Sequence, residues 1–480
     1  MKKFGLLLIL ALVLGLAMPA MGADFSFHGD FNNRFQLYTN QNSFFDAEQE
    51  GVLREQKVED NFGEAKYRLW TEAATNDGNV KGVFAIEFGG LRYGENDTSP
   101  GASNKNQGGG FSGDGVNIET RWAYTDFQIP FIDGKNRLQM GLNSQTMNKY
   151  FWAETVMGVK NYGSFDSLDY TVAWFRPRET NANTKDDTGQ DLDSFYGRIN
   201  IKPTDDLSLG FFGVYLYKDD PENTAAITDR GYEIKSFADD AEFNMFTIGV
   251  DGGYSVVLDP GKLFFKWDAL YQGGEINNAS FTPTAPGDQT GAALPGSSAN
   301  EDFDMNAYFF HLDAGFSWDK STLTYTFWYA SGDDDPEDDD FEGYLAVDVD
   351  SFDNHILFES LVDDNVFTER HYILDKGFIM NKLAFDYKAT DRLKLGAAVM
   401  YMLTAEDIEY IDNDGDDQSE DTIGFEIDAD MSYTLFKGLT FNLAAGYLIA
   451  DDAMDYFEED TDGNSDEDIF RLMSSIRYKF

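Results

Sequence analysis

The chain ends in Ile469-Phe470-Arg471-Leu472-Met473-Ser474-Ser475-Ile476-Arg477-Tyr478-Lys479-Phe480, and this stretch decides the fold. Apolar and aromatic residues occupy one parity: Phe470, Leu472, Ile476, Tyr478 and Phe480. Polar and basic residues occupy the other: Arg471, Ser475, Arg477 and Lys479. Alternation with a period of two residues predicts a β-strand with one apolar and one polar face. An apolar face that continues to a terminal aromatic is typical of a strand between lipid and water. An edge strand of a soluble sandwich is the alternative that this stretch leaves open.

The start of the chain after its first apolar run repeats the pattern. From Phe25 to Leu37, odd positions are mostly apolar or glycine and even positions are mostly polar. The two ends therefore predict matching strands. Matching end strands are what a cylinder needs if its first and last strands pair to close it.

Between the two ends, strand-like runs of about 9–12 residues recur, a length that suits tilted membrane strands. Short turns alternate with longer connections, which gives eight short turns, nine long connections and 18 strands. The weakest strands lie near Val159 and Asn381, so 16 strands is the alternative. An even number of antiparallel strands with short periplasmic turns and long external loops predicts an all-β, up-and-down transmembrane β-barrel.

The N-terminus predicts export. Lys2 and Lys3 precede an apolar run from Phe4 to Ala17, and small residues follow. This layout is typical of a secretory signal peptide, and the apolar run is too short for a spanning helix. We predict a signal peptide at residues 1–22 and a single barrel domain at 23–480; cleavage after Ala23 is the close alternative.

Composition excludes several classes of function. The chain has no cysteine and only four histidines, so thiol catalysis and cysteine-ligated metals are excluded. Its net charge of −50 repels nucleic acid. No Gly-x-Ser-x-Gly, His-Glu-x-x-His or phosphate-binding glycine loop is present. We therefore predict that the protein is not an enzyme and has no cofactor, apart from Ca²⁺ or Mg²⁺ at acidic loops.

The strand rhythm, the signal peptide and the terminal Arg477-Tyr478-Lys479-Phe480 resemble those of bacterial outer-membrane porins, above all the homotrimeric porins of deltaproteobacterial type. The resemblance covers the whole mature chain but rests on architecture. It implies an integral outer-membrane protein, a homotrimer in contact with lipid, and passage of small solutes and ions. In that family a terminal aromatic strand is the signal for the barrel assembly machinery, which Tyr478 and Phe480 match.

The parity opposite the apolar face predicts the residues that line the lumen. Both signs of charge occur there, which predicts a polar, water-filled channel. The predicted pore-lining residues are Arg34, Lys66, Arg68, Glu119, Arg121, Arg137, Arg198, Lys266, Asp268, Asp313, Arg392, Asp428, Arg471 and Arg477. Pairing of these charges along the wall is the alternative to a direct role in selecting solutes.

The third long connection differs from the others because it is aromatic. It runs Met147-Asn148-Lys149-Tyr150-Phe151-Trp152-Ala153-Glu154, where the others are acidic or rich in glycine. In porins the third loop folds inward. We therefore expect Lys149, Tyr150, Phe151, Trp152 and Glu154 to form a constriction loop, with a membrane-interface anchor or a subunit contact as the alternative.

Acidic residues are concentrated in the last three long connections. Asp-x-Asp-Gly sequences there resemble calcium loops but do not complete the EF-hand spacing. Weak Ca²⁺ binding is expected at Asp412, Asp414, Asp416, Asp460 and Asp462, and divalent ions could bridge these loops to lipopolysaccharide. A solvated acidic surface is the alternative.

Three functions remain open. The first is a passive diffusion channel for small hydrophilic solutes, mildly selective for cations because a negative mouth enriches them. The second is a channel specific for a carboxylate or a sugar, which would need one sign of charge or a row of aromatics along the lumen. The third is a barrel that sheathes an electron-carrying partner. Mixed lumen charges favour the first.

Overall fold

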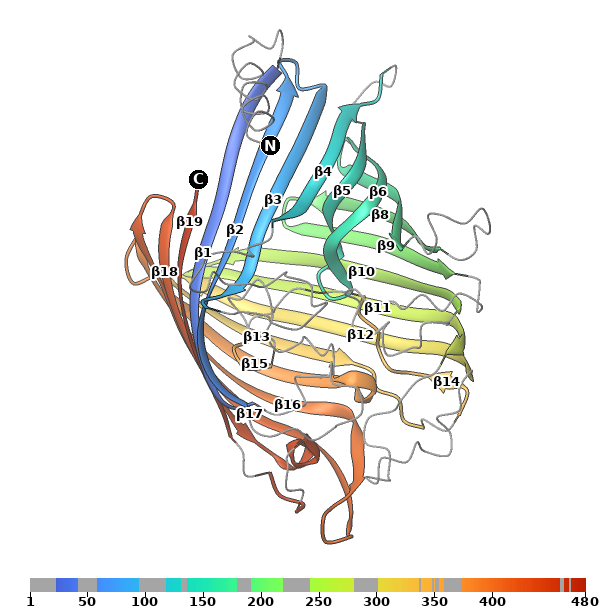
Figure 1. Ribbon diagram of the computed structural model, residues 1–480, viewed down its shortest axis with the longest axis vertical. Helices are drawn as coiled ribbons and strands as arrows, with labels where there is room; N and C mark the ends of the chain where they lie inside the picture. The colour runs from blue at the N-terminus through green and yellow to red at the C-terminus, as the bar shows by residue number, and fades with distance from the viewer. Residues whose placement is uncertain are drawn as a thin grey trace, which may run out of the picture.

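The computed structural model describes residues 23–41, 58–94, 118–130, 136–178, 191–218, 242–279, 301–335, 338–347, 349, 354–357, 373–457, 462–465 and 468–480. They form one antiparallel sheet whose strands follow each other around a barrel (Figure 1). The barrel strands are β1 (Ala23–Gln41), β2 (Val58–Thr75), β3 (Val80–Arg92), β4 (Glu119–Gln128), β5 (Arg137–Asn148), β6 (Trp152–Phe165), β7 (Leu168–Arg178), β8 (Leu192–Thr204), β9 (Leu207–Lys218), β10 (Glu242–Leu258), β11 (Gly261–Ala279), β12 (Glu301–Trp318), β13 (Ser321–Ala330), β15 (Phe378–Tyr387), β16 (Leu393–Ile411), β17 (Asp417–Phe436), β18 (Leu439–Ala450) and β19 (Ile469–Lys479).

The first and last strands close the barrel. β1 pairs with β19 in one antiparallel register, from Asp30 opposite Lys479 to Thr39 opposite Phe470. Beyond that register, Gly29 and Phe480 exchange two backbone hydrogen bonds of 3.1 and 3.0 Å. Closure leaves no unpaired edge among the described strands of the barrel, as a bilayer requires. The predicted 18-stranded barrel is confirmed, and β14 (Asp340–Phe341) is only a two-residue strand that runs parallel to β12.

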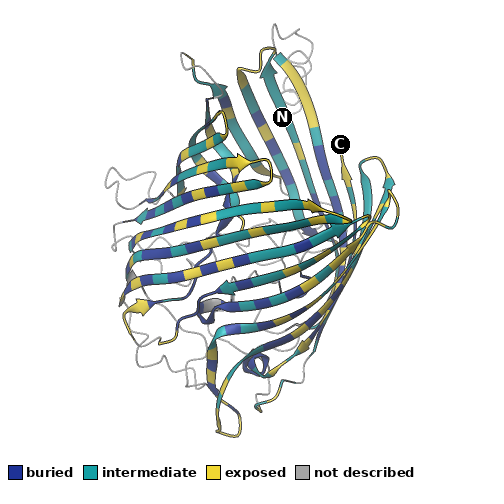
Figure 2. Cartoon of the chain, turned by 180° about the vertical axis from the view of Figure 1, so that it is seen from behind, coloured by how far each residue is buried: buried dark blue, intermediate teal, exposed yellow. Residues whose placement is uncertain are grey.

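Residues alternate between exposed and buried along most of the strands, as the bands in Figure 2 show. On β1 the outward Phe25 and Phe27 are 57% and 64% exposed, whereas the inward Arg34 and Gln36 are buried. On β19 the outward Leu472 and Ile476 are exposed and the inward Arg471 is buried. The apolar parity therefore faces outwards, where a bilayer would cover it.

The strand bounds put eight short turns at one end of the barrel and nine connections at the other. Two of those nine are also short: 149–151 between β5 and β6, and 412–416 between β16 and β17. The expectation of a long loop at each is wrong. β6 begins at Trp152 rather than near Val159, because its first residues pair directly with β5.

The lumen holds a hydrophobic core near the end with the nine connections. Inward residues of the wall, such as Phe243 and Phe309, pack there with Phe151 of the β5–β6 hairpin and Tyr344 of the β13–β15 connection. A solvated acidic surface was expected for that connection. Its segment 344–347 instead lies inside the barrel, where burial of apolar side chains offsets the cost of ordering it.

Backbone polar groups of the inward segment 344–347 are paired. Val347 N donates to Phe151 O at 2.8 Å, and the Tyr344 hydroxyl donates to Tyr150 O at 3.0 Å. Gln272 on β11 donates to Leu345 O and accepts from Leu345 N, both at 2.8 Å. These bonds replace those to water, so the segment and the hairpin are held together across the lumen. Within the described ranges, no helix is long and apolar enough to cross a membrane.

Candidate functional site

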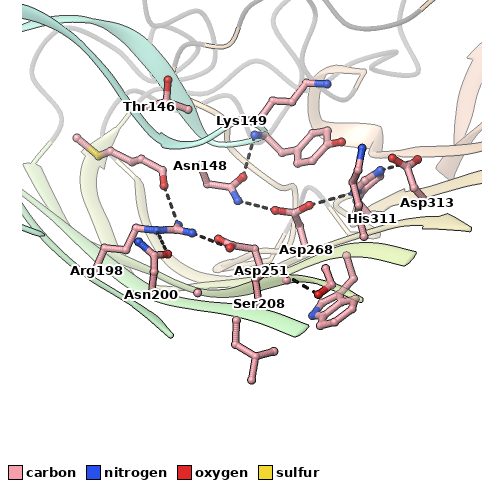
Figure 3. A pocket seen from close by; sticks show the side chains of 18 of the residues that line it. Thr146, Asn148, Lys149, Arg198, Asn200, Ser208, Asp251, Asp268, His311 and Asp313 are labelled. Carbon is pink, nitrogen blue, oxygen red and sulfur yellow. Dashed lines mark hydrogen bonds and ion pairs between the residues drawn. The ribbon is translucent and has the colours of Figure 1, made fainter. Parts of the chain in front are cut away.

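A cavity of about 870 Å³ with both charged and apolar lining residues lies in the lumen between the tip of the β5–β6 hairpin and the short turns. Its wall comes mainly from β8 to β15, and the hairpin forms its roof through Met147, Asn148, Lys149 and Tyr150. Figure 3 shows two groups of charged side chains facing it: one around Arg198 and one around His311. Both groups reach the hairpin.

Arg198 joins the wall to the hairpin on one side of the cavity. Its guanidinium donates to Asp251 Oδ1 at 2.6 Å, to Asn200 Oδ1 at 2.8 Å and to Met147 O at 3.3 Å. A charge-assisted pair of this kind fixes the planar guanidinium in one orientation. Arg198 therefore supports the hairpin beside its turn as well as lining the cavity.

His311 joins the opposite wall to the hairpin. Its Nδ1 lies 3.0 Å from Asp268 Oδ2, and its Nε2 lies 3.2 Å from Asp313 Oδ1. Asp268 Oδ1 accepts a bond of 2.7 Å from Asn148 Nδ2 at the hairpin tip. The Tyr150 ring covers the imidazole, with the two ring centroids 4.6 Å apart.

A wall of ion pairs runs along β1 to β6. Arg34 pairs with Glu64 at 2.8 Å, and Arg137 pairs with Asp126 at 2.5 Å. Glu87 receives Arg68, Lys66 and Arg121, and Arg121 also reaches Glu154 at 3.1 Å. Opposite charges this close are largely neutralised locally. The ion pairs therefore hold the charged side chains of this wall in place.

A second inward segment, 354–357, is held on the β17–β19 wall. Glu426 Oε1 accepts from the backbone N–H of His355 and Ile356 at 2.9 and 2.8 Å, and Asp428 Oδ2 accepts from His355 at 3.1 Å. Arg471 Nη1 donates to His355 O at 2.6 Å. Acidic groups thus bind N–H donors and a basic group binds a carbonyl, which is the electrostatic match that a buried backbone needs.

The structure gathers some predicted residues and separates others. Arg198, Lys266, Asp268, Asp313 and Lys149 all line the cavity. Arg477 pairs with Asp30 at the seam at 2.6 Å, away from it. Glu119 is an exposed first residue of β4, and Arg392 is exposed in the β15–β16 turn, so these two charges lie at the ends of the barrel. Trp152 and Glu154 belong to β6 rather than to a loop.

Sequence reasoning missed several residues that build the site. Asp251 has the inward parity of β10 and could have been found from it. Gln272 likewise has the inward parity of β11. Asn148 and Leu345 had no such signal, because their roles depend on segments that meet only in three dimensions.

The expected calcium residues are partly within the described ranges. Asp412 Oδ1 accepts from the N–H of Asp414 and Asp416 at 3.0 and 2.8 Å, and Oδ2 accepts from Gln418. These donors, the Asp416 N–H first, lower the pKa of the Asp412 carboxyl. Among the described residues no group of three potential metal ligands lies together, and Asp460 lies outside them. Calcium binding stays a prediction.

The closed barrel and its charged lumen define a transmembrane β-barrel of 18 strands. No protein-family model and no curated protein matches the sequence. Solved structures do match in shape. OccK8 (OprE) of Pseudomonas aeruginosa has a TM-score of 0.54 at 12% identity, over 95% of this chain and 98% of that one. OpdL from the same organism gives 0.54 at 10% identity, over 95% and 99%. Its outer membrane protein opdK gives 0.51 at 9% identity, also over 95% and 99%. These matches in shape, at such low identity, show a shared fold and nothing beyond it.

Proposed function

We propose that the protein is an outer-membrane channel through which small hydrophilic solutes and ions diffuse passively. The observation that carries this proposal is a closed barrel with an apolar outer face and a charged lumen that retains a cavity of about 870 Å³. A barrel of this size is wide enough for an aqueous path. The fold shared with a protein described as an outer membrane protein supports the location.

Reconstitution tests the proposal. Purified barrels in planar lipid bilayers should give stepwise increases in current, and liposomes that contain them should release small sugars but retain large dextrans. Barrels that insert without any conductance step would contradict the channel. In this arrangement the short turns face the periplasm, and the hairpin with segment 344–347 forms the narrow part.

Finer features of the proposal follow from the same residues. The excess of acidic residues supports mild cation selectivity. Residues 1–22 are removed on export, Tyr478 and Phe480 form the signal for the assembly machinery, and acidic connections contact lipopolysaccharide. The resemblance to trimeric porins leads us to propose a homotrimer, which three equal closure steps in single-channel recordings would support.

A second candidate is a sugar-specific channel, and an aromatic cluster at the lumen face of β1, β2 and β4 favours it. Trp70 stacks on His28 with ring centroids 5.2 Å apart and meets Trp122 edge-to-face at 5.7 Å. Aromatic faces beside charged pairs suit the apolar faces and hydroxyl groups of a sugar. A sugar that interrupts the current should do so less in Trp70→Ala. Equal interruption would remove this candidate.

A further inference from the structure

The His311 imidazole is the centre of a series of polar contacts between the hairpin and the opposite wall (Figure 3). The side chain lies on β12 and is only 3% exposed. It contacts Asp268, Asp268 accepts from Asn148, and Asn148 Oδ1 accepts from the backbone N–H of Tyr150 at 2.8 Å. The Asp268 carboxylate therefore holds the hairpin tip on this side of the lumen, in addition to the bonds that Tyr150 and Phe151 make with segment 344–347.

Both imidazole nitrogens face carboxylate oxygens. Nδ1 is 3.0 Å from Asp268 and Nε2 is 3.2 Å from Asp313. Ionised carboxylates only accept hydrogen bonds, and a neutral imidazole has a single N–H. The geometry is therefore satisfied in full only by the imidazolium, which has two. Loss of the proton would turn a nitrogen lone pair towards one of the carboxylates and remove the bond.

The surroundings of His311 strengthen these two bonds and make the loss of one costly. Asp313 is fixed independently, because Thr326 of β13 donates to it at 2.6 Å. The rings of Tyr150 and Trp328 cover the imidazole and limit the access of water. Inside such an environment each polar contact is stronger than in water, and each unmet one costs more. Charged groups that line the same cavity are Lys149 from the hairpin, Arg198 from β8, Asp251 from β10, Lys266 and Asp268 from β11, Asp313 from β12 and Lys382 from β15.

We propose that His311 is the positioning residue of the constriction. As an imidazolium it orients Asp268, and Asp268 holds Asn148 and the hairpin tip across the lumen. Deprotonation of His311 leaves its remaining N–H towards Asp313, frees Asp268 and loosens the tip, so the passage widens in alkaline solution. The inference rests on the proposed channel function for its effect on solutes, but the attachment of the hairpin can be measured without any conductance.

Thiol labelling measures the attachment directly. The chain has no cysteine, so Met147→Cys introduces a unique thiol at a hairpin residue that is 1% exposed. A membrane-impermeant maleimide is applied at one pH, about 6, where the imidazolium forms. Adding His311→Phe, which keeps the ring packing and removes both N–H groups, should accelerate labelling about 10-fold or more because the hairpin opens locally. Equal rates in the two proteins would overturn the proposal.

Conductance across a pH range from about 5 to about 10 adds a signature that a purely structural role would not produce. The unsubstituted channel should widen as pH rises. His311→Phe should be wide at every pH. Asp268→Asn should stay narrow in alkaline solution, because its amide can accept from Asn148 and donate to a neutral imidazole. Asn442→Ala removes a lumen amide bonded to Ser475 on β19 and should keep the original profile.

The outcomes separate the two proposals. Two results would overturn the role of His311 and leave the channel intact. One is a conductance of the unsubstituted channel that does not change with pH, and the other is equal conductance of the two variants in alkaline solution. Absence of all current would contradict the channel, and the labelling rates would still decide whether His311 holds the hairpin. Each variant is first shown to be folded by its heat-dependent mobility in gels.

Discussion

Arg34 and Glu64 show how a charged residue is kept inside the barrel wall. The pair is buried at 2.8 Å, and Gln36 donates to Glu64 while accepting from Arg471 at 2.6 Å. The network links β1, β2 and β19 and continues to the inward segment through His355. A pair this buried adds little net stability, but removing one partner leaves an uncompensated charge.

Glu64→Leu should therefore lower the free energy of unfolding by about 3–5 kcal/mol, because Arg34 keeps its burial and loses its counter-ion. Urea titration of the barrel in lipid vesicles measures this value. The control is Asp391→Ala, which breaks an ion pair of 2.9 Å with Lys388. The Asp391 side chain is 96% exposed and the Lys388 side chain is 50% exposed. That change should stay within about 1 kcal/mol. Similar losses in both variants would contradict the argument.

Asp333 makes the inward β13–β15 connection sensitive to pH. Burial and the nearby Asp375 carboxylate raise the pKa of Asp333 to about 8 from its ordinary 3.8. The folded state thus binds this proton more tightly than the unfolded chain does. Its contribution to stability is complete below about pH 4 and is lost as the pH rises through about 8.

Hydrogen exchange tests whether stability falls as the pH rises. Amides of segment 344–347 should exchange faster at pH 8 than at pH 5 after correction for intrinsic rates. Asp333→Asn, which cannot ionise, should protect them equally at both values. A variant with the same pH dependence as the unsubstituted protein would show that another group is responsible.

The β5–β6 hairpin forms the roof of the cavity, and we predict that it narrows the lumen. Its turn has only three residues, 149–151, yet it meets β12, β13 and the inward connection. Replacing 147–153 by a tight two-residue turn should raise single-channel conductance at least about 2-fold, because the roof of the cavity is removed. Shortening 412–416, at the tip of the β16–β17 hairpin, is the control. Unchanged conductance in the first variant would contradict the prediction that the hairpin narrows the lumen.

The period-two pattern predicted the strands well and the interior less well. On β1 and β19 most of the inward residues are polar, so the pattern indicates both the strand and the face that meets lipid. On β9 both faces are apolar, since Phe211 is exposed and its neighbours Phe212 and Val214 are buried in the lumen core. The period-two pattern needs apolar residues on one face and polar residues on the other, so it cannot identify an apolar residue that faces inwards.

Pairings within the site could not be predicted for a different reason. Parity identified Arg198 and Asp268 as lumen residues, but it does not show which other residues lie close to them. Arg198 meets Asp251, 53 positions later, and Tyr344 meets Tyr150 at a separation of 194. Which residues meet depends on the tilt and stagger of the barrel and on how the inward segments settle, and both are properties of the closed sheet.

The seam that closes the barrel ends in a contact between Phe480 and Gly29. A Cβ placed on Gly29 would lie 2.4 Å from Phe480 Cε1, so only glycine lets the ring lie there. Deleting Phe480, or Gly29→Val, should lower the folded fraction several-fold while the barrels that do assemble conduct normally. Phe436→Ala, at another rim aromatic that is 73% exposed, is the control. Normal assembly without Phe480 would contradict its role in closing the seam.

The charge of the whole chain gives the last prediction. Acidic residues outnumber basic ones by 86 to 36, while many charges of the lumen wall are paired with opposite ones. The uncompensated negative charge is therefore expected at the ends of the barrel, as at the exposed Asp414 and Asp416 of the β16–β17 tip. Such charge attracts cations to the mouth over a Debye length of about 10 Å at 0.1 M salt.

Reversal potentials in salt gradients should therefore show cation preference at about 0.01 M salt and little at about 1 M, where the Debye length falls to about 3 Å. The double variant Asp414→Asn, Asp416→Asn should weaken the preference at low salt and leave conductance at high salt unchanged, because it alters the mouth and not the cavity. Anion preference at low salt would refute this account. A preference that persists at high salt would instead place the selective charges inside the lumen, beside Asp251, Asp268 and Asp313, where salt screens them less.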